Sequence, residues 1–181
     1  MDTQAGKGYS GQMKKILPDF TNTEILASAV RTIQTEKAGL EALAVSLDNG
    51  LAEAFARAVE TLGVISGRVI VTGVGKSGHI GAKIAATMAS TGTPAHFVHP
   101  AEANHGDLGM IAKDDAIIVL SWSGESAELK GILAYSRRFG IPLIAFTAGA
   151  DSALGREADI VLLLPREQEA CPHGLAPTTS T

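Results

Sequence analysis

The stretch VTGVGKSGHIG, residues 71–81, decides the fold of this chain. An apolar run leads into glycines with the spacing Gly73-x-Gly75-x-x-Gly78, and a segment with helical character follows. A buried strand that turns through glycines directly into a helix is typical of a parallel α/β protein, in which ligands bind beyond the carboxyl ends of the strands. The stretch therefore predicts a strand, a tight turn and a helix, with a phosphate as the expected ligand of the turn.

This turn is similar to two nucleotide-binding loops and fits neither of them well. A triphosphate loop has a glycine five positions before the glycine of Gly-Lys-Ser, and Ile70 stands there. A dinucleotide loop has the observed glycine spacing, but it needs an acid at the end of the next strand, and Glu102 comes late for that role. A tight turn without any ligand is a further alternative.

Five short apolar runs indicate strands that are buried on both faces, because they are nearly continuous instead of alternating. They cover residues 68–74, 95–99, 116–121, 142–147 and 159–164. Helical patterns lie between them, at 77–90, 102–112, 126–139 and 152–157, and two more precede the first strand, at 22–47 and 50–65. This alternation predicts a doubly wound, Rossmann- or flavodoxin-like three-layer α/β fold with a five-stranded parallel sheet.

The composition narrows the classes of function. The chain has 181 residues, enough for one domain with a sizeable core, and its net charge of −4 leaves no basic surface for nucleic acid. Cys171 is the one cysteine, so no internal disulfide can form, and we expect a cytoplasmic protein. Without a run of about 18 apolar residues we expect no membrane span. We expect residues 1–21 to be a flexible extension and residues 22–181 to be the domain.

The first predicted helix begins near residue 22, with Asn22 or Thr23 as its expected cap. Its apolar stripe, which includes Ile25, Leu26 and Ile33, is expected to pack on the sheet or on another subunit.

A second polar loop, SWSGES at 121–126, follows the third predicted strand. Ser121, Ser123 and Ser126 offer hydroxyls, and the backbone N–H groups at the start of the next helix offer further donors for an anion. One serine would indicate only a helix cap, but three around Gly124 at the carboxyl end of a strand favour a phosphate site. Glu128 lies in the first turn of the helix, where it either stabilises the helix dipole or faces the ligand.

Two further segments carry polar groups at the same edge. HPAEANHGDLGMI, residues 99–111, contains His99 and His105, which have the chemistry of metal ligands or acid–base groups but no clear ligand spacing. PREQEACPHGLAPTTST, residues 165–181, contains Glu169 and Cys171, and we expect a packed thiol at Cys171. The chain ends in Thr and Ser residues of the kind that precede a helix, where we would expect another element to begin.

Four strings together resemble the sugar isomerase (SIS) domain, and more closely the arabinose 5-phosphate isomerases. They are GVGKSGHIGAKIAATMASTGTPA, FVHPAEANHGDLGMI, SWSGESAEL and EACPHGLAPTTST, in a region of resemblance that covers about residues 22–181. The resemblance implies interconversion of D-ribulose 5-phosphate and D-arabinose 5-phosphate through a cis-enediol, which supplies the eight-carbon acid Kdo for bacterial lipopolysaccharide. It also implies a homotetramer with sites between subunits and no cofactor.

The resemblance also assigns roles to individual positions. The residues implied to bind the sugar phosphate are Gly75, Ser77, Ser121, Ser123, Gly124, Ser126, Thr178 and Thr179. Those implied to act in catalysis are Lys76, His105, Glu128 and Glu169, with Glu128 or His105 as the base and Lys76 as the stabiliser of developing charge.

The chain departs from the family pattern in two respects. The phosphate loop of the family usually reads Ser-Asn-Ser-Gly-Glu-Ser, and here Trp122 replaces the Asn. Full-length members also continue with a further helix, a further histidine and paired CBS modules. Two other functions stay open: a non-catalytic SIS module that senses a sugar phosphate or nucleotide sugar, and a 3-hexulose-6-phosphate isomerase.

Overall fold

The computed structural model describes residues 20–180. Five parallel strands form one sheet in the order β2-β1-β3-β4-β5. Their bounds are β1 Val69–Gly73, β2 Ala95–Phe97, β3 Ala116–Leu120, β4 Leu143–Thr147 and β5 Ile160–Leu163. All five strands lie within the predicted apolar runs, so the predicted parallel sheet is confirmed.

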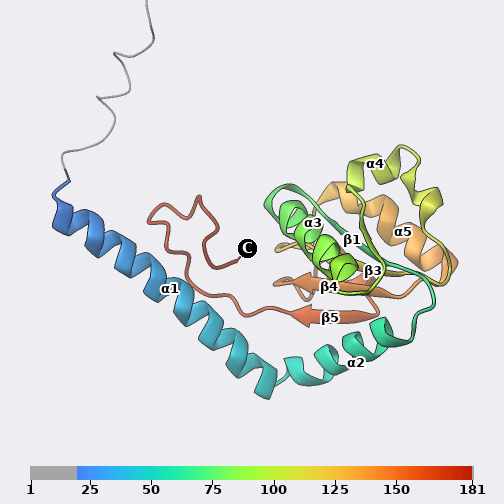
Figure 1. The fold of residues 1–181 in the computed structure, drawn as a ribbon, viewed down its shortest axis with the longest axis horizontal. Coiled ribbons are helices and arrows are strands. Elements are labelled where there is room, and N and C mark those ends of the chain that lie inside the picture. The colour runs from blue at the N-terminus through green and yellow to red at the C-terminus, as the bar shows by residue number, and fades with distance from the viewer. Residues whose placement is uncertain (1–19, 181) are drawn as a thin grey trace, which may run out of the picture.

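The helices lie between the strands as predicted (Figure 1). Their bounds are α1 Asn22–Asp48, α2 Leu51–Val64, α3 Gly75–Ser90, α4 Pro100–Asn104, α5 Lys130–Phe139 and α6 Ala153–Glu157. Short 3₁₀ turns, η2 at Asp107–Met110 and η3 at Ala127–Leu129, complete the order of elements. No helix within residues 20–180 is long and apolar enough to cross a membrane.

Two hydrophobic cores cover the two faces of the sheet. Val69 and Val71 of β1 point toward α2 and α3, where they pack with Ala58 and Ala85. Ile70, between them, points to the opposite face and packs with residues of α4, α5 and α6. Because successive side chains of a strand point to opposite faces, a strand buried on both sides has to be apolar throughout. The three-layer, doubly wound arrangement is thereby confirmed.

The sequence predictions were wrong in two local details. The side chain of Thr21, and not Asn22 or Thr23, caps α1, in a reciprocal capping box with Glu24. The helix predicted over residues 102–112 is instead α4 followed by η2, because the chain turns at Gly106, whose φ of 138° ends the helix.

Helix α1 extends away from the sheet and contacts mainly α2 and the C-terminal segment (Figure 1). A stripe of apolar side chains on α1 stays exposed, and it consists of Leu26, Val30, Ile33 and Leu40. Of the two packing modes predicted for these residues, packing on the sheet is not observed. An apolar stripe of this length that residues 20–180 leave exposed is an unusual surface for an isolated domain.

The strand order places two loops side by side. The chain moves outward from β1 to β2 on one side and from β3 to β5 on the other, so the order reverses between β1 and β3. Ligands of doubly wound folds bind at this topological switch point, outside the carboxyl ends of the strands. The turn from β1 into α3, with the first residues of that helix, holds Gly75 and Ser77, and the loop after β3 holds residues 121–126; we call these the first and the second loop.

Candidate functional site

The glycines after β1 allow α3 to start against the sheet. A side chain on Gly73 would approach the carbonyl oxygen of Leu120 to 2.9 Å, and one on Gly78 would approach the carbonyl oxygen of Gly73 to 2.6 Å. Gly75 adopts a φ of 59°, which favours glycine. The spacing that resembles a dinucleotide loop thus follows from the packing of α3 on β1 and from one left-handed turn residue.

The serine loop after β3 is closed by weak internal hydrogen bonds. The backbone N–H of Gly124 donates to the Ser121 hydroxyl at 3.2 Å, and that hydroxyl lies 3.4 Å from the Ser126 hydroxyl. The N–H of Glu125 donates to the Ser123 hydroxyl at 3.3 Å. These distances are at the long end for hydrogen bonds, so the same donors can turn toward an anion at little cost.

The same loop is fixed from behind by α6. The Glu125 carboxylate accepts the N–H of Ala153 at 2.9 Å, and the carbonyl oxygen of Gly124 accepts the N–H of Leu154 at 3.0 Å. Gly124 has a φ of 69°, and a side chain there would collide with Ser152. The loop can therefore keep its shape while its hydroxyls exchange partners.

A small cavity of about 110 Å³ lies between the two loops. We call it the inner cavity. Ser77 and Ser121 contribute its polar groups together with Ser180, and its apolar lining consists of Ile80, Leu120, Trp122, Phe146 and Leu164. The structure thus brings Ser77, from the first loop, to the same cavity as Ser121, from the second. A mostly apolar hollow with a few convergent hydroxyls has the character of a small-molecule site.

The C-terminal segment is held by one carboxylate. The Oε2 atom of Glu169 accepts the N–H of Thr178 at 2.6 Å, the N–H of Thr179 at 2.8 Å and the Thr178 hydroxyl at 3.0 Å. Burial raises the pKa of Glu169, but the hydrogen bonds from Ser180, Thr179 and Thr178 outweigh it and lower that pKa to about 2. Glu169 is therefore ionised at neutral pH, and its acceptor oxygen is already engaged.

A larger cavity of about 320 Å³ lies between this segment and α1, and we call it the outer cavity. Its lining includes Leu40, Glu167, Thr178 and Thr179, together with Trp122, Leu164 and Ser180, which also line the inner cavity. Thr179 fits against Gly39 of α1, where any side chain would collide with its methyl group. The two cavities thus meet at shared residues.

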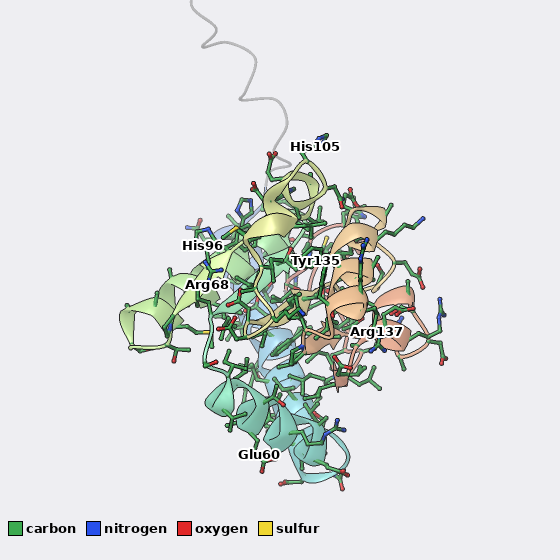
Figure 2. The ribbon with its side chains drawn as sticks, turned by 90° about the vertical axis from the view of Figure 1, so that its right-hand side faces the viewer. Glu60, Arg68, His96, His105, Tyr135 and Arg137 are labelled. Atoms are coloured by element: carbon green, nitrogen blue, oxygen red, sulfur yellow. The ribbon has the colours of Figure 1, made fainter. Side chains whose placement is uncertain are left out.

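The three remaining predicted catalytic residues lie outside these cavities. Lys76, His105 and Glu128 are exposed, and none of them lines the inner or the outer cavity. Figure 2 shows His105 at the tip beyond α4, with its side chain directed away from the body. The Asn104 amide donates to the carbonyl oxygen of Glu128 at 3.0 Å, so the segments that carry His105 and Glu128 are neighbours.

The predicted metal ligands do not form a cluster. The Nδ1 atom of His99 accepts the N–H of Ala101 at 3.2 Å and caps α4, which gives this histidine a local structural role. No three His, Cys, Asp or Glu side chains gather into a metal site within residues 20–180. Cys171 is half-buried, and the backbone N–H groups of Ala176 and His173 hold the pKa of its thiol below the ordinary value.

Among the contributors to the site that were not predicted, three connect its parts. Leu164 and Ser180 line both cavities, and Gly39 receives Thr179. A glycine in the middle of a long helix is unfavourable by about 1 kcal/mol, so Gly39 did carry a signal of a close contact. Leu164 and Ser180 carried none, because an apolar residue after a strand and a serine in a polar tail are common.

The fold and the serine loop define a doubly wound α/β domain that presents hydroxyls and backbone N–H groups at its switch point. The family model of the SIS domain matches residues 64–181, so the chain belongs to the SIS domain family. The predicted membership is confirmed, although the matched region begins at the last residue of α2, Val64, and leaves α1 and the rest of α2 outside it.

Two relatives and one solved structure show how similar this chain is to known proteins. The arabinose 5-phosphate isomerase KdsD of Pseudomonas aeruginosa is 49% identical over 160 residues, which are 88% of this chain and 48% of that protein. The KdsD of Yersinia pestis is 51% identical over 151 residues, 83% of this chain and 45% of that protein. The chain thus spans about half the length of these relatives.

A solved structure, E. coli CFT073 c3406 in complex with A5P, superposes with a TM-score of 0.79 at 42% identity. The match covers 89% of this chain and 84% of that one. The resemblance to arabinose 5-phosphate isomerases found in the sequence is therefore confirmed by both relatives and structure.

Proposed function

We propose that this chain is the catalytic domain of an aldose–ketose isomerase that interconverts D-ribulose 5-phosphate and D-arabinose 5-phosphate. The observation that carries the proposal is the inner cavity at the switch point, where Ser77 and Ser121 converge beside the Ser121–Ser126 loop. Its support is the similarity to proteins named arabinose 5-phosphate isomerase and to a structure that holds A5P. The serine hydroxyls and loop N–H groups would bind the phosphate, with Ser123, Gly124 and Ser126 on one side and Gly75 and Ser77 on the other.

The isomerisation needs a base, a proton return and a stabiliser of negative charge. The base removes a proton from the carbon next to the carbonyl, a cis-enediol forms, and the proton is returned to the neighbouring carbon. Glu128 and His105 are the proposed candidates for the base, because their segments are joined through Asn104 at the carboxyl end of the sheet. Lys76 at the start of α3 is the proposed stabiliser of the enediolate oxygen.

Glu169 is suited to a different part in the reaction. With a pKa of about 2 and its Oε2 atom saturated by donors, it is a weak proton acceptor near pH 7. We propose that it acts as a positioning residue, which holds Thr178 and Thr179 at the wall of the outer cavity.

We further propose that the protein self-associates through α1, as a homotetramer. The support is the exposed stripe of Leu26, Val30, Ile33 and Leu40 on a helix that extends away from the sheet (Figure 1). A second copy of the chain is the proposed partner, because two equivalent apolar stripes bury each other in a two-fold contact, and one further interface would join two such dimers into the tetramer. The proposed place of action is the cytoplasm, where the product would supply Kdo for lipopolysaccharide.

The test is an assay on the protein expressed from its complete open reading frame. Ribulose 5-phosphate is supplied, and the formation of arabinose 5-phosphate is followed by NMR. Turnover is expected, and exchange of solvent deuterium into the product at C2 would support the enediol. Binding of arabinose 5-phosphate without turnover would favour the sensing module, and turnover of hexulose 6-phosphate in place of ribulose 5-phosphate would overturn the substrate assignment.

A further inference from the structure

Glu125 is an anionic residue within the serine loop, which is itself proposed to bind an anion. It lies between Ser123 and Ser126 in the sequence, and its side chain is exposed. A free carboxylate at this position would repel a phosphate and would compete with it for the hydroxyls and N–H groups of the loop. Where this carboxylate is held therefore affects any anion that the loop binds.

The structure holds the Glu125 carboxylate at the start of helix α6. The N–H groups in the first turn of a helix have no acceptor within that helix. Glu125 accepts the N–H of Ala153 at 2.9 Å, and the carbonyl oxygen of Gly124 accepts the N–H of Leu154 at 3.0 Å. The first two N–H groups of α6 thus take their acceptors from adjacent residues of the serine loop.

These bonds to α6 differ from the bonds that the serine hydroxyls make. The hydroxyls of Ser121, Ser123 and Ser126 take part in contacts of 3.2 to 3.4 Å inside the loop. The bond from Ala153 is shorter, and its acceptor is charged, which makes it the stronger kind. An anion that enters the loop can therefore replace the long contacts while the bond to α6 stays in place.

We propose that Glu125 is a positioning residue for phosphate binding. By accepting the N–H of Ala153, its carboxylate fastens the serine loop to α6 and stays engaged there instead of taking up the donors of the loop. The loop then meets the ligand in its binding shape, so that less ordering is needed on binding. The inference rests on the proposed function for the phosphate at the serine loop, and it adds a residue to those that the resemblance implied.

The hydrogen bond can be removed from either side. Glu125→Ala removes the acceptor, and Glu125→Gln keeps an acceptor oxygen without the charge. Ala153→Pro removes the donor, since proline suits the first position of a helix and Ser152 before it already has an extended backbone, with φ −73° and ψ 166°. Glu157→Ala, at the other end of α6, is the matched control, because the Glu157 carboxylate pairs with Arg137.

The dissociation constant of arabinitol 5-phosphate, a probe that cannot isomerise, is measured by calorimetry on the complete protein and on each variant. We expect Glu125→Ala and Ala153→Pro to weaken binding by about tenfold each, because a charge-assisted hydrogen bond no longer holds the loop in its binding shape. The two changes combined should bind no more weakly than either alone, because both remove the same bond. Glu125→Gln should bind nearly as the wild type does, and Glu157→Ala should bind normally.

Turnover of ribulose 5-phosphate separates a positioning role from a merely structural one. A loop that receives the phosphate less well raises KM and changes kcat less, because the phosphate is bound alike before and during the reaction. A variant that is only partly folded shows a lower apparent kcat at an unchanged KM. We expect Glu125→Ala to raise KM by about tenfold, in line with its dissociation constant.

Binding by Glu125→Ala that equals or exceeds that of the wild type would overturn the inference, and tighter binding would mean that the carboxylate only repels the phosphate. Normal binding by Ala153→Pro would overturn it as well, because Glu125 would then not act through that N–H. If Ala153→Pro does not fold, the comparison of Glu125→Ala with Glu125→Gln decides. Equal losses in these two variants contradict a role as hydrogen-bond acceptor.

The outcomes separate this inference from the proposed function. Isomerisation of ribulose 5-phosphate together with unchanged affinity in Glu125→Ala refutes the role of Glu125 alone. Weaker binding by that variant, in a protein that does not isomerise ribulose 5-phosphate, refutes the reaction and leaves Glu125 as the positioning residue of a phosphate-binding loop. Failure of the wild type to bind arabinitol 5-phosphate refutes both.

Discussion

The backbone N–H of Thr178 donates to the Glu169 carboxylate at 2.6 Å, which joins two residues nine positions apart through one charged oxygen. The same oxygen accepts the N–H of Thr179 at 2.8 Å, and Thr179 in turn fits against Gly39 of α1. One carboxylate therefore determines where the C-terminal segment meets the first helix, and the outer cavity depends on that contact.

We expect Glu169→Gln to loosen this segment, because an amide oxygen binds N–H donors less strongly than a carboxylate. Hydrogen exchange at the amides of Thr178 and Thr179 should become faster by about tenfold, the effect of losing a charge-assisted bond. Glu167→Gln is the matched control, since Glu167 lines the outer cavity and is exposed. Equal exchange rates in both variants would contradict the role of Glu169.

The same carboxylate predicts a dependence on pH. Its pKa is about 2 in the folded protein and ordinarily 4.5, so the folded state binds the proton less well than the unfolded state. The stabilisation is therefore complete above about pH 5 and is lost as the pH falls toward 2. In the wild type, the protection factor of the Thr179 amide, which is the intrinsic exchange rate at each pH divided by the observed rate, should fall over this range, and in Glu169→Gln this fall should be smaller.

Ser123→Ala should weaken the binding of arabinose 5-phosphate by about tenfold or more, because a hydrogen bond to a charged phosphate is lost. Ser123 is exposed in the loop after β3, so the substitution should leave the stability nearly unchanged. Ser90→Ala, at the far end of α3, is the control and should bind normally. Calorimetry measures both, and unchanged affinity in Ser123→Ala would remove this hydroxyl from the site.

Gly124→Ala should destabilise the protein more than Gly140→Ala does. Both glycines have a left-handed φ, 69° and 62°, so alanine costs about 1 kcal/mol of backbone strain at either position. A side chain at Gly140 would meet nothing within 4 Å, whereas one at Gly124 would collide with Ser152. Urea unfolding should show that Gly124→Ala lowers the free energy of unfolding by about 1–3 kcal/mol more than Gly140→Ala does. An equal decrease in the two variants would contradict the packing described.

Thr72→Val should raise the free energy of unfolding by about 1 kcal/mol, because its hydroxyl is fully buried and has no hydrogen-bond partner within residues 20–180. Thr147→Val is the matched control. The Thr147 hydroxyl is equally buried, but it donates to Trp122 and accepts the N–H of Gly149 at 3.1 Å, so its loss should destabilise. In urea unfolding, we expect the free energy of unfolding to increase in Thr72→Val and to decrease in Thr147→Val. A decrease in both variants would contradict the prediction for Thr72.

Val30→Glu combined with Ile33→Glu should break the proposed self-association, because charges would have to be buried in an apolar contact. Both side chains are exposed in the single chain, so its own fold should tolerate the change. Arg31→Glu changes charge on another side of the same helix and is the control. Light scattering after size exclusion measures the mass, and an unchanged assembly in the double variant would place the interface elsewhere.

The order of helices and strands could be predicted from the sequence because the local pattern of apolar and turn residues determines each element. A strand buried on both faces must be apolar throughout, so the five runs stood out, and Val69, Ile70 and Val71 indeed divide between two cores. The serine loop was readable because three hydroxyls around Gly124 exceed what a helix cap needs. The position of the turn from β1 into α3 beside the serine loop could also be predicted, because the strand order of a doubly wound fold brings these two segments together.

Only the tertiary structure decided how distant residues meet. Trp122 was visible as an unusual residue, but its place between two cavities depends on Ser180 and Leu164, which are distant in sequence. The resemblance implied a catalytic role for Glu169, and the structure shows that its Oε2 atom accepts hydrogen bonds from the N–H groups of Thr178 and Thr179. The sequence by itself thus determined the sheet, the helices and the serine loop that is proposed to bind a phosphate, since these arise from local periodicity and turn chemistry. The size of a cavity, and the hydrogen-bond partners and pKa of a carboxylate such as Glu169, arise from contacts between residues far apart in the sequence. No local pattern encodes them.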